Sequence, residues 1–508
     1  MPDNGEAGVP ATDARLIRTL TTPKIVFLIV AAAAPLAAMV CTVPLAFALG
    51  NGPGVPAMFA FAGLTLLCFS VGYGAMSRHI VNAGGFYTYV SSGLGRPPAV
   101  GAGMIAVVAY NTATVGLAGA FAYFAQLVAA SHGLDLRWEI WAALGLVLVG
   151  FLGYREINLS ARVLSVFMVC EVLVLIALDI AVLARHGFGS LPRTSFAPSN
   201  FTATGVGVAM MFGFVSFIGF ESAALYGEEA RDPKRSVPRA TYISVALISL
   251  FYAITSWLAV GAIGPSKVGS VATSQLGDMF FNLSDDYLDS AATTIMQILL
   301  CTSLLAGWLA LHNAANRYMF VMGRERLLPR WLDAVHSRHN AVHRASVVQT
   351  VFAVVVVAAF AAAGLDPYTS LATSMLGLGT LGIIVLQALA SLSVLGFYRK
   401  RSDRHWWRTG LAPLLGLAGL GTATVLVVSN FKIMTGTTNV VINAMPWLIL
   451  AAGVGGLGYA AWLRSNRPEQ YAAIAPAVTA EGKASASPAS EAPDAPETPT
   501  AFAGRTRG

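Results

Sequence analysis

Residues 210–240 read MMFGFVSFIGFESAALYGEEARDPKRSVPRA, and this stretch decides the fold expected of the chain. Its first half is apolar, rich in Gly and Phe, and carries one carboxylate, Glu221. Gly213 and Gly219 weaken helix propensity, and Ser216 can hydrogen-bond to the backbone instead. Irregular backbone at bilayer depth is tolerated only where protein buries it or where it lines a wet cavity. An interrupted membrane span with an acid is therefore expected to form a binding site.

The composition points to an integral membrane protein. Of the 508 residues, 56% are hydrophobic and 11% are charged, far from the composition of an ordinary soluble domain. The four cysteines lie in apolar runs without metal-ligand spacing, so we expect no metal or other cofactor. The net charge is +7, but in a membrane protein the positions of the basic residues indicate orientation in the bilayer. We therefore expect no nucleic-acid partner. The polar start and the long first apolar run argue against a cleavable signal peptide.

We predict an all-α protein with twelve transmembrane helices, because runs of about 20 apolar residues can cross a bilayer. A polar cytoplasmic arm covers residues 1–22, the membrane domain covers 23–466, and a disordered cytoplasmic tail rich in Ala, Pro, Ser, Glu and Thr covers 467–508. The predicted spans are 25–49, 56–76, 99–129, 138–153, 162–184, 203–226, 240–263, 290–316, 345–363, 369–396, 410–430 and 443–463.

The basic residues orient the chain. With the N-terminus in the cytoplasm, 27 of the 32 Lys and Arg residues fall on the cytoplasmic side. This asymmetry satisfies the positive-inside rule. We therefore expect a multi-pass protein of the plasma membrane with both termini in the cytoplasm.

Three acids lie within the spans, away from their ends: Glu171, Asp179 and Glu221. Ionisable groups in a membrane are costly and by default suggest a pathway or a relay. Asp179 lies toward the extracellular end of its helix, where a water-contacting or structural role is expected. Glu171 lies about 15 Å from the inner end, near the midplane.

The first span is also expected to be interrupted. Pro35 and Pro44 each remove a backbone donor, so the helix should kink or open between them. The first and sixth spans occupy matching places in two five-helix halves. That pairing indicates an inverted-repeat transporter whose substrate binds at the midplane. The alternative is a continuous helix that the two prolines only kink.

Several motifs resemble those of the amino acid–polyamine–organocation (APC) permease superfamily, in the same topological order. The sixth span and its loop contain residues 217–221 (FIGFE) and 228–240 (EEARDPKRSVPRA). Residues 83–89 (AGGFYTY) and 93–95 (GLG) resemble the loop after the second helix, and residues 317–318, 323–325 (GRE) and 328–329 resemble the loop after the eighth. The resemblance covers roughly residues 25–430.

The resemblance implies the LeuT-type fold, with two inverted five-helix repeats, two further helices, and discontinuous helices 1 and 6. It also implies substrate contacts with helices 1 and 6. The residues that it assigns to the substrate are Ala37, Ala38, Met39 and Val40 on helix 1, and Val215, Ser216, Phe217 and Ile218 on helix 6. Ala37 and Met39 replace two family glycines that flank the carboxylate site, which favours an amine substrate.

Glu171 is a second departure, because many relatives have a lysine at this place. An apolar environment disfavours a charged carboxyl group, so Glu171 and Glu221 are candidate proton-coupling residues. Alternatively, an ionised Glu171 could hold a cation together with Thr302 and Ser303. We rank protonation first. The structural alternative is that both acids only hydrogen-bond neighbouring helices or freed backbone groups.

Three further residues are candidates for the site because of their places in helices 3 and 8. Tyr110 and Asn111 on helix 3 are candidate substrate contacts, and Trp308 on helix 8 is a candidate gate. The plainer alternatives are that Trp308 is packing and that Asn111 bridges helices. The charges of residues 228–239 are expected to form a structural cytoplasmic network.

The leading function is a secondary transporter for an amino acid or a related organic amine, with proton-coupled uptake. An exchanger of amino acids or amines is the main alternative, and a sodium-coupled symporter or a non-transporting membrane sensor ranks lower. We expect no enzyme, because no nucleophile–base pair or ligand cluster is apparent. The expected partners are the small-molecule substrate, a proton or other cation, and the lipid bilayer.

Overall fold

The computed structural model describes residues 20–80, 85–155, 161–201, 204–221, 230–336, 341–399 and 401–474. Most of these residues are helical, and Leu20 and Ala230 form an isolated parallel bridge. The α-helices are α1 (Thr22–Ala33), α2 (Pro35–Leu49), α3 (Val55–Met76), α4 (Gly85–Leu94), α5 (Arg96–Ser131), α6 (Trp138–Tyr154), α7 (Ala161–His186), α8 (Val206–Val215), α9 (Pro233–Ile263), α10 (Val268–Gln275), α11 (Met279–Tyr287), α12 (Ser290–Arg324), α13 (His343–Ala362), α14 (Thr373–Tyr398), α15 (Ala412–Thr435), α16 (Val440–Asn443), α17 (Pro446–Asn466) and α18 (Pro468–Ala473).

Short helical segments connect many of these elements. The 3₁₀ segments are η1 (Gly52–Gly54), η2 (Gly187–Ser190), η3 (Arg193–Phe196), η4 (Pro198–Phe201), η6 (Leu276–Asp278) and η7 (Arg330–Asp333), and the π segments are η8 (Pro367–Ala372) and η9 (Trp406–Leu411).

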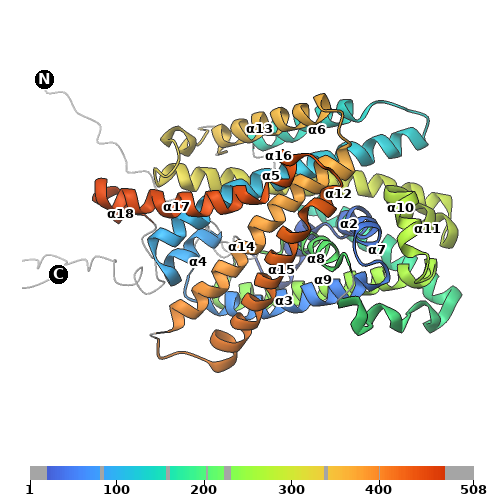
Figure 1. The fold of residues 1–508 in the computed structure, drawn as a ribbon, viewed down its shortest axis with the longest axis horizontal. Helices are drawn as coiled ribbons and strands as arrows, with labels where there is room; N and C mark the ends of the chain where they lie inside the picture. Colours follow the sequence, from blue (N-terminus) through green and yellow to red (C-terminus); the bar gives the residue numbers. More distant parts are fainter. Residues whose placement is uncertain are drawn as a thin grey trace, which may run out of the picture.

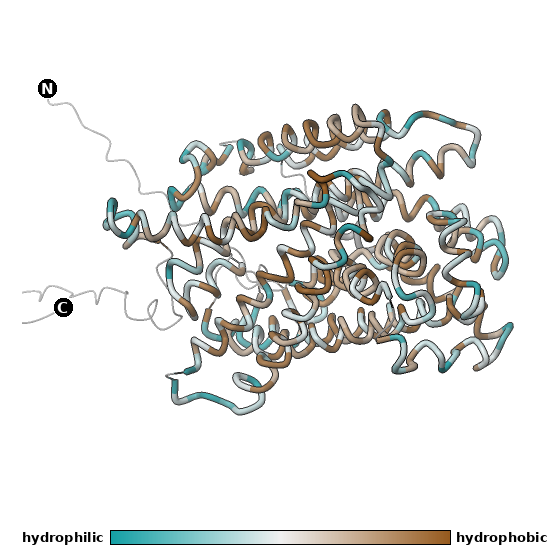
Figure 2. The backbone as a smooth tube through the Cα atoms, viewed as in Figure 1, coloured by the Kyte–Doolittle hydropathy of each residue, from teal (hydrophilic) through white to brown (hydrophobic). Residues whose placement is uncertain are grey.

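The long helices form a bundle around two shorter ones. Helix α5 packs against α12, α14 and α17, while α3 packs against α9. Helices α2 and α8 pack against each other and are nearly surrounded by the longer helices (Figure 1). Figure 2 shows hydrophobic residues along the middle of the bundle and hydrophilic residues gathered toward its two ends. This distribution is the one expected of a protein that crosses a bilayer.

Ten helices of the described residues are long and apolar enough to cross a membrane. The predicted fourth and sixth spans fall on shorter apolar helices, Trp138–Tyr154 and Val206–Val215. The all-helical membrane architecture is thus confirmed.

The first span is interrupted at Ala34, one residue earlier than the interval between the two prolines. Ala34 has the left-handed backbone angles φ 45° and ψ 70°, which separate α1 from α2. Pro35 then begins α2, where its missing N–H is not needed and its fixed φ suits a helix. Pro44 lies inside α2, which continues to Leu49. Residues 37–40, predicted to lie in opened backbone, are helical.

The sixth span stops being α-helical at Val215. Residues 216–219 form turns, in which the Phe217 and Ile218 N–H groups donate to carbonyls three residues earlier. Gly219 has φ 109°, a conformation that favours glycine. Residues 222–229, which include Glu228 and Glu229 of the predicted cytoplasmic network, lie outside the described residues.

The chain after the last span differs from the prediction over its first residues. Disorder was expected from residue 467, yet Pro468–Ala473 form helix α18. The guanidinium of Arg96 donates to the carbonyls of Ala472 (2.8 Å) and Ile474 (3.1 Å) and lies over the Tyr471 ring. These contacts hold the segment against the start of α5. Residues 1–19 and 475–508, the remaining parts of the predicted arm and tail, lie outside the described residues.

Replacing Arg96 with Ala is expected to release α18, because it removes two hydrogen bonds and a cation–π contact. We predict that chymotrypsin then cleaves after Tyr471 several times faster in the detergent-solubilised protein, as measured by mass spectrometry. Replacing the exposed Arg239 of α9 with Ala is the matched control. Equal cleavage rates in the two variants would show that Arg96 does not hold α18 against α5.

Candidate functional site

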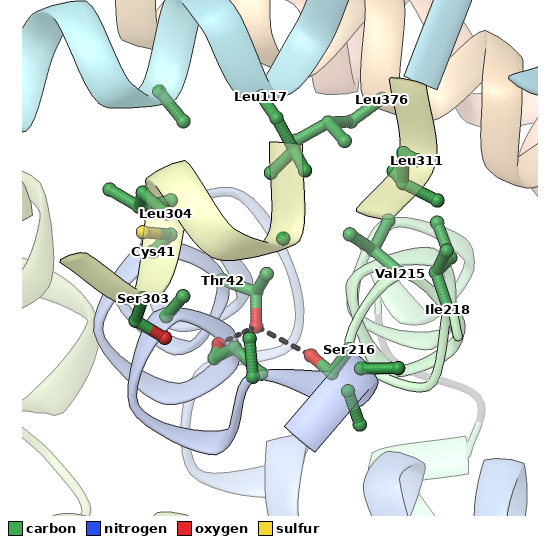
Figure 3. Close-up of a pocket in the computed structure, with 17 residues that line it drawn as sticks. Cys41, Thr42, Leu117, Val215, Ser216, Ile218, Ser303, Leu304, Leu311 and Leu376 are labelled. Carbon is green, nitrogen blue, oxygen red and sulfur yellow. Dashed lines mark hydrogen bonds between the residues drawn. The ribbon is translucent and has the colours of Figure 1, made fainter. Parts of the chain in front are cut away.

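A pocket lies where the interrupted segments of the first and sixth spans meet α5, α12 and α14 (Figure 3). Its volume is about 70 Å³, so in this conformation it is smaller than most small-molecule sites. The lining residues are Ala32, Ala33, Ala34, Ala37, Ala38, Cys41, Thr42, Leu117, Ala120, Val215, Ser216, Ile218, Ser303, Leu304, Gly307, Leu311 and Leu376. Among the described residues, the lining includes no charged side chain.

A pair of hydroxyl groups joins the two interrupted segments beside this pocket. The Thr42 and Ser216 side-chain oxygens lie 2.7 Å apart, and Figure 3 shows them facing each other from α2 and from the turn after α8. Only one hydroxyl hydrogen is needed for this contact. The other hydroxyl can donate to a carbonyl of its own segment, at Ala38 or Phe212. The pair therefore links α2 to the sixth span without leaving a buried polar group unpaired.

Neighbouring helices provide hydrogen-bond partners for backbone groups on both sides of the interruption at Ala34. The Tyr252 hydroxyl of α9 donates to the carbonyl of Ala33, the last residue of α1 (3.3 Å). The carboxyl group of Glu171, from α7, accepts a hydrogen bond from the Leu36 N–H in the first turn of α2. Glu171 also accepts from the Ser303 hydroxyl of α12 at 2.8 Å. Glu171 thus connects the start of α2 to a residue that lines the pocket.

Glu221 occupies a separate polar cluster. Its carboxyl oxygens accept from the Tyr110 hydroxyl and from the Gly219 N–H, each at 2.9 Å. The Tyr110 ring stacks on Tyr318, with centroids 4.9 Å apart. Glu221 is buried and does not line the pocket. Its contacts fix the end of the sixth span against α5.

Asp179 lies farther along α7. The Thr255 hydroxyl of α9 donates to its carboxyl group at 2.7 Å. This contact agrees with the structural role considered for Asp179 in the sequence analysis.

The predicted substrate residues divide into two groups. Those that line the pocket are Ala37, Ala38, Val215, Ser216 and Ile218. The others lie elsewhere: Met39 and Val40 are buried away from the pocket, and Phe217 packs edge-on against Tyr252 with centroids 5.5 Å apart. Helical geometry explains why only two of the four predicted α2 residues line the pocket. Residues 37, 38, 41 and 42 share one face of α2, whereas residues 39 and 40 do not.

Three residues predicted from their positions also lie outside the lining. The Asn111 amide donates to the Val107 carbonyl of its own helix, and Tyr110 binds Glu221 as described. Trp308 packs against Phe121, with ring centroids 5.9 Å apart. Of the two conceivable cation ligands, Ser303 reaches Glu171, whereas Thr302 donates to the Leu299 carbonyl within α12.

The sequence analysis did not single out Thr42, Gly307, Leu36 or Tyr252. A polar residue such as Thr42 within an apolar run was a usable signal. The sequence gives no such signal for Gly307 or for the backbone of Leu36, because their importance depends on which helix faces them.

These features define a class: an all-helical membrane protein with a small pocket between interrupted spans, as in membrane transporters. A family model described as amino acid permease matches residues 20–454. The chain therefore belongs to the amino acid permease family.

The relatives are transporters with modest sequence identity. An uncharacterized transporter of Mycobacterium tuberculosis (strain ATCC 25618 / H37Rv) is 27% identical over 379 residues, which cover 74% of this chain and 78% of the relative. The branched-chain amino acid permease BcaP of Bacillus subtilis is 25% identical over 394 residues, covering 72% and 79%. Cationic amino acid transporter 7, chloroplastic, of Arabidopsis thaliana is 24% identical over 330 residues, covering 60% and 54%.

A solved structure has a similar fold. The manganese transporter of Eremococcus coleocola matches with a TM-score of 0.53 and 12% identity, over 91% of this chain and 99% of that chain. At this identity the likeness concerns the fold alone.

At Gly219 the sixth span comes close to the backbone of the first span. A Cβ atom at Gly219 would lie 2.7 Å from the Ala32 carbonyl oxygen, and its φ of 109° strains any other residue. We predict that Gly219→Ala costs about 1–3 kcal/mol and lowers the thermal unfolding midpoint in detergent.

Gly455→Ala on α17 is the matched control, since a Cβ there meets no heavy atom within 4 Å. An unfolding midpoint for Gly219→Ala equal to that of the control would refute this close approach.

Proposed function

We propose that this protein is a secondary active transporter that carries an amino acid or a related organic amine across the plasma membrane by alternating access. The pocket between the interrupted first and sixth spans supports this proposal most strongly. In the proposed topology the chain crosses the membrane twelve times, with α6 and α8 as the fourth and sixth crossings and both termini in the cytoplasm. The family membership and the transporter relatives support the same class of function.

The pocket can bind a small organic molecule mainly through apolar contacts. Its polar side chains, Thr42, Ser216 and Ser303, lie among alanines, leucines, a valine and an isoleucine. Several main-chain groups near Ala34 and Ser216 are close to this surface because the helices stop there. Such groups orient a ligand, while the apolar lining excludes water and shapes selectivity.

The linked segments are the proposed moving unit. Helices α2 and α8 pack together, and the Thr42–Ser216 contact joins them at the level of the pocket. Glu171 and Ser303 belong to α7 and α12, which face this unit from outside. Rocking of the unit against those helices would change the access of the pocket from one side of the membrane to the other.

We propose Glu171 as the proton-coupling residue. As a carboxylate it accepts hydrogen bonds from both the Leu36 N–H and the Ser303 hydroxyl. Protonation would weaken these two contacts, because a carboxylate is the stronger acceptor. The protonation state would then change how firmly the start of α2 is held to α7 and α12. An exchanger that uses no ion is the alternative for the same pocket.

Uptake into proteoliposomes tests the proposed function. L-Leucine and 3-methylbutylamine form a matched pair of radiolabelled probes, because they differ only by the carboxylate. We expect accumulation of at least one of them above protein-free liposomes when the outside is more acidic than the lumen. L-Lysine and putrescine serve as two additional probes. If none of the four probes shows uptake or counterflow, the proposal is contradicted.

Glu171→Gln tests the coupling. The amide oxygen can still accept from Leu36 and Ser303, so the fold is expected to persist, but the side chain no longer exchanges a proton. We predict that accumulation driven by a pH gradient is abolished, whereas counterflow of labelled probe remains within several fold of the unmodified protein. Glu469→Gln on α18 is the control. Accumulation by Glu171→Gln equal to that of the control would exclude Glu171 as the coupling residue.

A further inference from the structure

One glycine of the pocket has room for a methyl group without a steric clash. An added Cβ on Gly307 of α12 would meet only Leu117 Cδ1 at 3.6 Å and Ala34 Cβ at 3.9 Å, which are ordinary van der Waals distances. Most other buried glycines of the bundle differ. At Gly145 on α6, for example, an added Cβ would lie 2.5 Å from the Trp308 ring. Close helix packing therefore explains Gly145 but not Gly307.

Gly307 lies in the middle of the part of α12 that lines the pocket. On α12, Ser303, Gly307 and Leu311 follow one another at intervals of four residues and all line the pocket, so they form one stripe along the helix. Ser303 is at the end where it contacts Glu171, and Leu311 is at the other end. Gly307 lies between them and faces Ala34, the residue at the interruption of the first span.

The chemistry of the lining limits the ligand. The described lining residues provide no charged partner for a ligand side chain, and transferring an unpaired charge into an apolar site is costly. Glu171 is close, but it is 5% exposed and already accepts from Ser303 and Leu36. A branched aliphatic group fits such a surface, whereas a cationic or acidic side chain leaves its charge without a partner.

We infer that the pocket selects a substrate with an uncharged aliphatic side chain of about the size of that in leucine, and that Gly307 sets this size limit. This inference rests on the proposed transport function and names its substrate class. A methyl group at position 307 would occupy part of the space of the substrate side chain. Leu311 closes the same stripe at its other end, so shortening Leu311 should enlarge the space.

The test compares the uptake of a size series in proteoliposomes. The probes are L-alanine, L-leucine, L-phenylalanine, L-lysine and L-glutamate, with ethylamine and 3-methylbutylamine as carboxylate-free counterparts of alanine and leucine. In the unmodified protein we expect uptake of leucine or 3-methylbutylamine, and lysine and glutamate at the level of protein-free liposomes. One methyl group in an apolar pocket changes discrimination by about 10-fold or more.

Gly307→Ala is therefore expected to lower the leucine-to-alanine uptake ratio, or the corresponding amine ratio, by about 10-fold. Leu311→Ala is expected to raise phenylalanine uptake relative to leucine. Gly455→Ala controls for the change in helix propensity, and its ratio should equal that of the unmodified protein. A ratio of uptake rates also separates a size effect from a general loss of folded protein, which would lower all rates together.

Three outcomes would overturn the inference while leaving the transport function intact. They are an unchanged size ratio in Gly307→Ala, an unchanged phenylalanine-to-leucine ratio in Leu311→Ala, and lysine or glutamate uptake as fast as that of leucine. Failure of the unmodified protein to take up any probe would instead contradict the proposed function, and the inference with it.

Discussion

The interruption of the first span at Ala34 is the constraint on which the rest of the site depends. In a bilayer no water is available to pair with freed N–H and C=O groups, and each unpaired buried group costs about 1–3 kcal/mol. Here the Tyr252 hydroxyl binds the carbonyl that ends α1, and Glu171 accepts from an N–H that begins α2. Pro35 removes one further donor that would otherwise need a partner. The break is thus compatible with the membrane because α7 and α9 supply its hydrogen bonds.

The same contacts connect the break to the pocket. Ser303 touches Glu171 and also lines the cavity, while Thr42 and Ser216 join the two interrupted spans at its edge. In the proposed mechanism, a change in the protonation of Glu171 would therefore reach the first turn of α2 directly through hydrogen bonds. Glu221 serves a different part of the molecule, since it binds Tyr110 and the backbone of Gly219. The two acids that the sequence marks as equivalent thus occupy different environments.

The all-helical membrane architecture could be predicted from the sequence, because long apolar runs follow directly from the chemistry of a bilayer. The family was recognisable from motifs such as residues 217–221, and it is confirmed by the match over residues 20–454. The site was harder to predict. Residues of α2 were assigned by motif spacing, but only Ala37 and Ala38 of that group face the pocket, because a helix turns 100° at each residue. Gly307 and Tyr252 depend on contacts between distant helices, for which a single sequence carries no local signal.

The central claim is that the interruption at Ala34 and the turn at Ser216 together form the substrate site. A cryo-electron microscopy map of the protein in lipid nanodiscs, with saturating L-leucine or 3-methylbutylamine, tests it most directly. The account predicts separate α1 and α2 helices and ligand density bounded by Ala34, Ser216 and Gly307. A first span that runs as an unbroken helix through Ala34, with the ligand bound elsewhere, would contradict it.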